Sequence, residues 1–416
     1  MNYYKLVFVP TIVIVSWAAS LSWGQSTEDW PQFLGFNRNG MAGEIELLDQ
    51  FPPTGPEKLW AVEVATGMSG LAVSQGKVFT LAQDDHGQYA LALDLESGQN
   101  AWQQRIAEPY QNSQGDGPRS TPTVTKDAVL AFTGQGWLVS LDRESGKLNW
   151  KVDLVSTLGG KVSEYGMSCS PLVIGDKVVV QTGAPQAAVV AVSLDQGAIV
   201  WKTGHGPAGY SSPCLLNVGG ESHIVALLGD QVLGIDAESG KALWSYPFVT
   251  DYNCNTANPI EVAGKVLVSA GEDHGVALLQ INKENNSYNA LSIWESLGVK
   301  SSLRSEWQTP IAIDGVVYGF DNVGGAGPVT HLVAVDAANG MQLWREPRFG
   351  KCNAILADGK LVMSSMTGEL ILAKVNRSGY QELARAKVCG PTRQAPVLAG
   401  SKVLLRDSES IVCVRL

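Results

Sequence analysis

Charged residues are scarce in this 416-residue chain, and basic residues never cluster. Only 17% of the residues are charged, the net charge is −10, and no run of lysine or arginine is longer than a pair. Proteins that bind nucleic acid need basic groups facing the phosphates. The sequence therefore predicts no nucleic-acid partner.

Long apolar runs are absent after the first 24 residues. A membrane-spanning helix needs about 20 consecutive apolar residues, so we expect no transmembrane span in the mature chain. The start of the chain has a positive charge, an apolar run over residues 6–19, and small residues Ser22 and Gly24 before Gln25. This pattern is typical of a signal peptide. It indicates an exported protein, periplasmic or secreted; an uncleaved N-terminal anchor is the alternative.

Adjacent cysteines are also lacking. The sequence leaves disulfide connectivity undefined, and we expect free buried thiols rather than bridges. The six cysteines occur singly, at Cys169, Cys214, Cys254, Cys352, Cys389 and Cys413.

What the chain does have is a repeated segment. In residues 334–344 it reads as a strand, a tight turn and a second strand, with Asp336, Gly340 and Trp344 spaced four residues apart. The Asp side chain can bond the turn backbone, the Gly can adopt positive φ, and the Trp supplies a broad apolar surface. Further copies lie at Asp94, Gly98 and Trp102; at Asp142, Gly146 and Trp150; at Gly197 and Trp201, with Ser193 in the Asp position; and at Asp236, Gly240 and Trp244.

Three copies are degenerate. One has Asn282 and Asn286, with Trp294 four residues late; one has Gly379 and no Trp; and Trp60 lies on a strand without the turn. The tryptophans recur every 42 to 51 residues. Each interval has room for four short antiparallel strands, which is the blade of a β-propeller.

Counting the copies predicts an all-β, eight-bladed β-propeller of four-stranded antiparallel blades. The last strands, within residues 402–416, lack an outer partner, and the first strand, residues 58–64, lacks inner ones. We therefore expect the N-terminal strand to complete the C-terminal blade and close the ring, which removes an exposed edge. The predicted organisation is a signal peptide at 1–24, a strap and Pro-rich link at 25–57, and the propeller at 58–416. The strap is expected to pack Trp30 and Phe33 onto the ring.

The repeat resembles a known family. The pattern from Ala92 and Asp94 to Trp102 is similar to the tryptophan-docking repeat of the pyrroloquinoline quinone (PQQ)-like, quinoprotein alcohol dehydrogenase-like propellers. That superfamily includes PQQ-dependent alcohol and sugar dehydrogenases. It also includes the BamB lipoprotein of the outer-membrane β-barrel assembly machinery, which binds partners without a cofactor. Residues 29–40 also resemble the opening of uncharacterised exported bacterial PQQ-repeat proteins.

The resemblance leaves two functions open. In the dehydrogenases the quinone stacks on a disulfide between adjacent cysteines and binds calcium, and large loop insertions build the substrate pocket. This chain lacks such a cysteine pair, and its loops are short. The favoured interpretation is a binding or scaffold module for an envelope protein or a small-molecule ligand, with no cofactor and no evident catalytic residues. The alternative is a PQQ-dependent oxidoreductase of the alcohol or sugar dehydrogenase type, with PQQ and calcium.

Candidate site residues follow from the topology of a blade. The link into each innermost strand and the turn between the second and third strands lie on one face, around the mouth of the channel. Polar and aromatic groups that converge there could bind a ligand; solvated loops are the alternative. The candidates on these segments are Arg119, Glu164, Tyr165, Tyr210, Asn253, Asn255, Arg304, Glu306, Trp307, Lys351 and Arg393.

Two further motifs are not expected to be sites. The similar turns 84–87 and 272–275 combine carboxylates with a histidine, but they fall in blades on opposite sides of the ring and cannot share a metal ion. The glycine-rich segment 321–331 lacks the Lys-Ser/Thr and the helix that a phosphate-binding loop needs, and we expect a surface hairpin. We predict no metal site, and the sequence does not define the oligomeric state.

Overall fold

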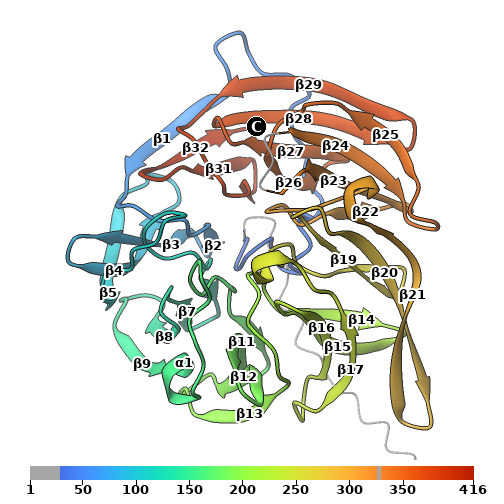
Figure 1. Cartoon of the computed structure of the whole chain (residues 1–416). Helices are drawn as coiled ribbons and strands as arrows, with labels where there is room; N and C mark the ends of the chain where they lie inside the picture. Colours follow the sequence, from blue (N-terminus) through green and yellow to red (C-terminus); the bar gives the residue numbers. More distant parts are fainter. Residues whose placement is uncertain (1–28, 326–328) are drawn as a thin grey trace, which may run out of the picture.

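The computed structural model describes residues 29–325 and 329–416, which form a closed ring of eight antiparallel sheets of four strands each (Figure 1). The predicted all-β, eight-bladed propeller is confirmed. The predicted signal peptide lies outside the described residues. Of the helices in the described part, none is long and apolar enough to cross a membrane.

Each blade runs from an innermost first strand at the channel to an outermost fourth strand. The blades are numbered in chain order from the first sheet after β1. Blades 1 to 4 consist of β2 Ala72–Ser74, β3 Lys77–Asp84, β4 Gly87–Asp94 and β5 Asn100–Ala107; β6 Thr123–Val124, β7 Ala128–Phe132, β8 Trp137–Asp142 and β9 Leu148–Asp153; β10 Leu172–Ile174, β11 Lys177–Ala184, β12 Ala187–Ser193 and β13 Ile199–Thr203; β14 Cys214–Val218, β15 Glu221–Leu227, β16 Gln231–Asp236 and β17 Ala242–Pro247.

The second half of the ring follows the same plan, except that the first strand of the chain completes the last blade. Blades 5 to 8 consist of β18 Ile260–Val262, β19 Lys265–Ala270, β20 Gly275–Glu284 and β21 Ser287–Leu297; β22 Ile311–Ile313, β23 Val316–Val323, β24 Val329–Asp336 and β25 Gln342–Glu346; β26 Cys352–Ala357, β27 Lys360–Ser365, β28 Glu369–Asn376 and β29 Gly379–Lys387; β30 Val397–Ala399, β31 Lys402–Arg406, β32 Ser410–Arg415 and β1 Glu57–Glu63.

Three short helices lie in the links between blades. The sequence reasoning did not predict α1 Leu154–Thr157, whose N-cap Asp153 accepts a bond from the Ser156 backbone N–H. The other two are the 3-10 helices η1 Asp251–Asn253 and η2 Gly298–Lys300.

Ring closure occurs as predicted. β1 pairs antiparallel with β32, with Ala61 opposite Val412 and Glu63 opposite Ser410. Figure 1 shows the blue β1 lying outside the red β32. Trp60 then packs on blade 1, where its Nε1 donates to the Leu95 carbonyl at 2.9 Å.

A β-bulge precedes the tryptophan position in every blade. In blade 1, Trp102 pairs with Ala92 while Asn100 pairs with Leu93, which leaves Ala101 unpaired. The same one-residue shift occurs in the fourth strand of the other seven blades. A bulge redirects the neighbouring side chain, and here the side chain faces the next blade.

Most of these tryptophans bond the next blade at the turn between its third and fourth strands. The Trp294 Nε1, for example, donates to the Ala337 carbonyl at 3.0 Å. The repeat glycine of that turn, Gly340, has φ +74°, and a Cβ there would lie 2.5 Å from the indole. Corresponding bonds run from Trp60 to Leu95, Trp102 to Arg143, Trp150 to Leu194 and Trp344 to Asn376.

Three blades lack this bond. In blade 3 the buried Trp201 Nε1 has no hydrogen-bond partner among the described residues, although its indole packs on Gly240 of blade 4. The other two cases coincide with the degenerate copies. In blade 5 the tip of the long β20–β21 hairpin takes the place of the repeat turn. Trp244 of blade 4 therefore has no such turn to bond, and its Nε1 donates instead to His223 Nδ1, also in blade 4, at 3.1 Å. Blade 7 has Ala384 in the tryptophan position. Blade 8 offers no turn to receive a tryptophan there, because its third strand, β32, is the last strand of the chain and its fourth is β1.

The strap packs across the ring before β1. Trp30 is 3% exposed and forms backbone bonds with Val73, whereas Phe33 is only half-buried. Figure 1 shows the blue segment that precedes β1 crossing the opening of the ring. Arg38 is buried inside the channel, where its guanidinium bonds the carbonyls of Ser170, Pro171 and Pro213 and the Thr123 hydroxyl.

All six cysteines are free, as predicted, and five of them are buried. The prediction of a surface hairpin at 321–331 is wrong for the two ends of that segment, which belong to strands β23 and β24. Asp321, Asn322, Thr330 and His331 are buried in β23 and β24, because their side chains bond neighbouring blade residues.

Candidate functional site

The ring has two distinct faces. We call the face that carries the links between blades and the turns between second and third strands the mouth face. The opposite face carries the other turns and the strap, and we call it the strap face. The eleven predicted site residues all lie on links of the mouth face, but the structure brings only some of them together.

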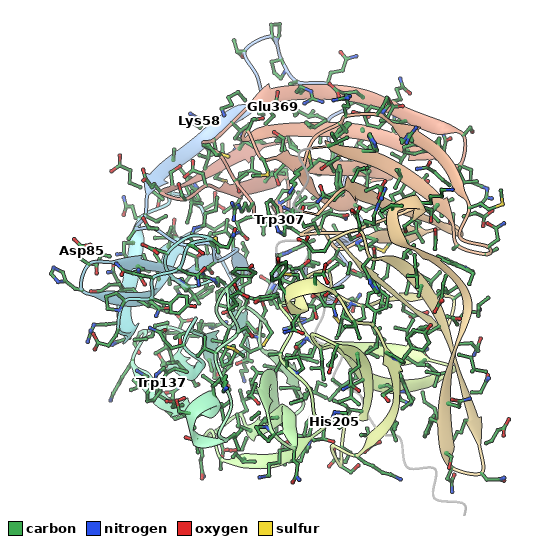
Figure 2. The ribbon with its side chains drawn as sticks, in the orientation of Figure 1. Lys58, Asp85, Trp137, His205, Trp307 and Glu369 are labelled. Atoms are coloured by element: carbon green, nitrogen blue, oxygen red, sulfur yellow. The ribbon has the colours of Figure 1, made fainter. Side chains whose placement is uncertain are left out.

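Four predicted residues form a cluster at the channel. The Lys351 Nζ lies 4.2 Å and the Arg393 Cζ 4.7 Å from the centre of the Trp307 ring. The Lys351 Nζ also forms a 2.5 Å ion pair with Glu306. Figure 2 shows Trp307 beside the opening of the ring. Because these residues come from the links into blades 6, 7 and 8, the cluster depends on the packing of successive blades around the channel.

Arg393 extends this cluster towards the first blades. Its Nη1 donates to the Gln114 carbonyl at 3.2 Å, and its own carbonyl accepts a bond from Asn353 Nδ2 at 2.9 Å. Gln114 belongs to the link between blades 1 and 2. The indole and the two cations together offer stacking and charge to a ligand at the channel.

Two predicted tyrosines form a second group. The rings of Tyr165 and Tyr210 lie 5.7 Å apart, and the Tyr165 backbone N–H donates to Tyr210 Oη at 3.2 Å. Burial raises the pKa of Tyr210 above its usual value, so the hydroxyl stays protonated. Burial, and then the nearby Glu272, Glu164 and Glu306 carboxylates, raise the pKa of Cys254 to about 11. Little thiolate therefore forms at neutral pH, which makes this thiol a weak nucleophile.

A groove of about 400 Å³ runs beside this group between blades 3 and 4. Its lining combines Glu164, Tyr210 and Asn253 with apolar Val162 and Tyr252. Apolar side chains also protrude from the neighbouring links: Val249 is 61% exposed, Tyr252 64% and Val299 72%. The sequence reasoning missed these apolar residues because nothing local distinguishes them from core residues.

Three predicted residues have structural roles instead. Buried Arg119 bonds the Gly115 and Gly117 carbonyls, and burial lowers its pKa. Asn255 Nδ2 bonds the carbonyls of Leu228 and Phe248. Arg304 pairs with buried Asp321 through Nε to Oδ1 at 2.7 Å and Nη2 to Oδ2 at 2.8 Å. These side chains use their bonds to fix the links.

The residues present do not fit a quinone site with calcium. Across residues 29–325 and 329–416, no group of three or more His, Cys, Asp or Glu side chains could hold a metal ion. In the two histidine-containing turns the carboxylates bond the protein instead: Asp84 accepts from the His86 backbone, and Asp273 accepts from Gly324. The cysteines are scattered, so a disulfide of adjacent cysteines cannot form.

A belt of hydrogen bonds around the channel also escaped the sequence reasoning. In blades 2 to 5, the residue before the opening proline donates its backbone N–H to the corresponding side chain of the next blade. The bonds run from Thr121 to Ser170 Oγ, Ser170 to Ser212 Oγ, Ser212 to Asn258 Oδ1 and Asn258 to Thr309 Oγ1, at 2.8–3.0 Å. The recurring Ser, Asn or Thr before proline was the available signal.

Residues 86–332 match the sequence family described as outer membrane protein assembly factor BamB. The chain belongs to this family of PQQ-like propellers. The match covers more than half of the chain and includes most of blades 1 to 6.

Individual relatives are distant in sequence. BamB of Yersinia pestis is 22% identical over 68% of this chain and 70% of its own length, and BamB of Bordetella pertussis is 23% identical over 86% of each. BamB of Escherichia coli K12 is 29% identical, but the match spans only 27% of that protein.

Solved structures agree with the fold. BamB from Moraxella catarrhalis is 16% identical, with a TM-score of 0.58, over 86% of this chain and 97% of that one. A quinohemoprotein alcohol dehydrogenase from Pseudomonas putida HK5 is 13% identical, with a TM-score of 0.66, over 94% and 80%. Because the superfamily fold carries unrelated activities, these similarities show the architecture alone.

Proposed function

We propose that this chain is an exported binding or scaffold module of the bacterial envelope, whose mouth face docks an envelope protein. The observation that carries the proposal is the exposed apolar surface on the links of blades 4 to 6, formed by Val249, Tyr252 and Val299. Exposed apolar groups beside polar and aromatic ones are typical of protein interaction sites. Family membership supports the proposal, since these relatives are named outer membrane protein assembly factors.

The eleven candidate residues enter this proposal in two ways. Glu164, Tyr165, Tyr210 and Asn253 border the groove beside the apolar surface. The cluster of Glu306, Trp307, Lys351 and Arg393 would contact the part of the partner, or the small-molecule ligand, that lies over the channel. Arg119, Asn255 and Arg304 would act indirectly by holding the links.

The binding test uses a double variant, Val249→Asp with Tyr252→Asp, in capture experiments from envelope extracts. Wild type is expected to retain a defined envelope protein, and the variant is expected to lose it, because two carboxylates replace the apolar contact. The matched control is Val200→Asp, a residue that is 47% exposed on the outermost strand of blade 3 and should bind normally. Capture of nothing by wild type would indicate a purely structural surface protein.

The quinone-dependent alternative is tested separately. Purified protein is titrated with PQQ in the presence of calcium and assayed for dye-linked oxidation of alcohols and sugars. We expect no quinone spectrum and no turnover, because the chain lacks adjacent cysteines and a metal-ligand group in its described part. Tight uptake of PQQ with turnover would reverse the assignment.

A further inference from the structure

The strap face carries a hollow with a volume of about 990 Å³. It lies between strap residues 37–41 and blades 4, 5 and 6, on the opposite side of the ring from the mouth. Residues that line it include Leu215, Glu261, Val262, Ile293, Ala312 and Asp314.

The same face already binds an extended segment of polypeptide. The strap forms backbone bonds with the first strands of three blades: Trp30 with Val73 in both directions, Pro31 with Val124, and Gly40 and Ala42 with Leu356, at 2.7–2.9 Å. In blades 1 and 7 these contacts are β-bridges. The exposed edge of a first strand is therefore used here for strand addition.

The hollow begins where these contacts stop. Over residues 29–56 the strap makes no backbone hydrogen bond with β14, β18 or β22, the first strands of blades 4, 5 and 6. Those strands line the hollow, which is continuous with the strap at Asn37, Asn39 and Met41. The hollow thus extends the surface that the strap occupies onto first strands that the strap leaves unpaired.

The side chains of the hollow indicate the chemistry of its occupant. Leu215 is 41% exposed and Ile293 45% exposed, so apolar groups are available for contact. At the rim, the exposed carboxylates of Glu261 and Asp314 outnumber the ammonium of Lys265. Arg38 also borders the hollow, but it is buried and its donors bond the blades.

We propose that this groove docks an extended peptide segment of a partner protein, with apolar residues at alternate positions and a basic residue at one end. The peptide backbone adds to the edges of β18 and β22, its apolar side chains contact Leu215 and Ile293, and its basic residue lies near Glu261 and Asp314. Strand addition supplies affinity through main-chain bonds, and the pockets for alternate side chains supply specificity. The site is independent of the mouth face.

The test uses the full chain and a fluorescein-labelled ten-residue peptide of alternating valine and threonine that ends in lysine. Anisotropy titration is expected to show saturable binding, about tenfold weaker for a peptide that ends in glutamate, because like charges then meet at the rim. Hydrogen exchange is expected to slow in β18 and β22 but not in β2 and β26, which the strap already covers.

Matched variants assign the binding to the groove. Ile293→Asp and Leu215→Asp should each abolish saturation. Ile199→Asp, on the outermost strand of blade 3 and 44% exposed, should bind like wild type. The proposal is overturned by absence of saturable binding to wild type, by equal binding to Ile293→Asp, or by exchange protection confined to the mouth face. Mouth variants should leave this binding unchanged, so failure here and failure of the proposed function can be told apart.

Discussion

At the scale of single residues, the repeat glycine serves both the turn and the contact between blades. Gly340 has φ +74°, and a Cβ there would lie 2.5 Å from the Trp294 ring. Gly379, the glycine of the degenerate copy in blade 7, pairs with Asn376 at the start of β29 and has no heavy atom within 4 Å of an added Cβ. The glycine of the repeat is thus under strong constraint where a tryptophan packs on its turn and nearly free where none does.

We predict that Gly340→Ala lowers the free energy of unfolding by about 2–4 kcal/mol, from left-handed backbone strain together with overpacking against the indole. Gly379→Ala should change it by less than about 0.5 kcal/mol. Thermal unfolding followed by near-ultraviolet circular dichroism measures both. Equal losses in the two variants would contradict this account of the repeat.

His223 adds a pH dependence to the contact between blades 4 and 5. Its Nδ1 accepts the Trp244 bond, Tyr288 packs on its ring at 5.1 Å, and burial lowers its pKa although Glu221 opposes the shift. A histidine with a folded pKa below its unfolded value of about 6.5 favours the neutral form. Its stabilisation is therefore complete above that pH and is lost as the pH falls through it.

We therefore expect the unfolding temperature to fall between pH 7.5 and 5.5, and to fall less in His223→Gln. His274 and His331 also have pKa values lowered by burial, so part of the slope should remain. Thermal scans at half-unit pH steps measure the slopes. Identical slopes in the variant and wild type would exclude His223 as a contributor.

At the scale of elements, adjacent blades are joined by tryptophans at the outside and, from blade 2 to blade 6, by the hydrogen-bond belt at the channel. Ser212 participates twice in the belt: its Oγ accepts the Ser170 backbone N–H at 2.9 Å, and its own N–H donates to Asn258. Both serines are about 2% exposed. Loss of the acceptor would leave a buried N–H unpaired.

Ser212→Ala is expected to cost about 1–3 kcal/mol of stability, the penalty of an unsatisfied buried donor. Ser408→Ala, at an exposed serine in a turn of blade 8, is the matched control and should be neutral. Hydrogen exchange measures the effect locally, because the backbone amide of Ser170 should exchange faster in the variant. Unchanged exchange there would show that the belt does not hold the blades.

At the scale of the whole molecule, the two ends of the chain meet in one blade. Trp60 is 8% exposed, sits on β1 and packs on Gly98 of blade 1, so it connects the last blade to the first. Trp60→Ala should cost about 3–5 kcal/mol through the cavity it leaves. Release of β1 would also expose the edge of β32.

Limited proteolysis measures the release of β1 directly, because a loosened β1 becomes cleavable within residues 50–64 before the rest of the ring is cleaved. Trp294→Ala, in the middle of the chain, serves as the comparison: it should lose similar stability without early cleavage near β1. Early cleavage in both variants would argue against a special role for the closing strand.

Much of the architecture was predictable because short sequence patterns specify it. The Asp, Gly and Trp spacing encodes the turn and the contact with the next blade, and a repeat that contacts only its neighbours can be read one unit at a time. The missing Trp of blade 7 also follows, since ring closure leaves no turn in blade 8 to receive it.

The composition of the candidate sites depends on distances between residues far apart in the chain, and no local sequence pattern specifies those distances. Trp307 meets Arg393, 86 positions further along the chain, only because the ring brings their links to one opening. Likewise, Arg304 looked like a ligand residue until the fold placed Asp321 beside it.

The sequence by itself determined the number of blades, the strand order within them and the closing pair, because turn conformation and apolar periodicity act over a few residues. Only the tertiary structure decided that the strap inserts Arg38 into the channel and makes no backbone hydrogen bonds with the first strands of blades 4 to 6. Those features arise where several blades converge on one segment, and their energy depends on all of them at once.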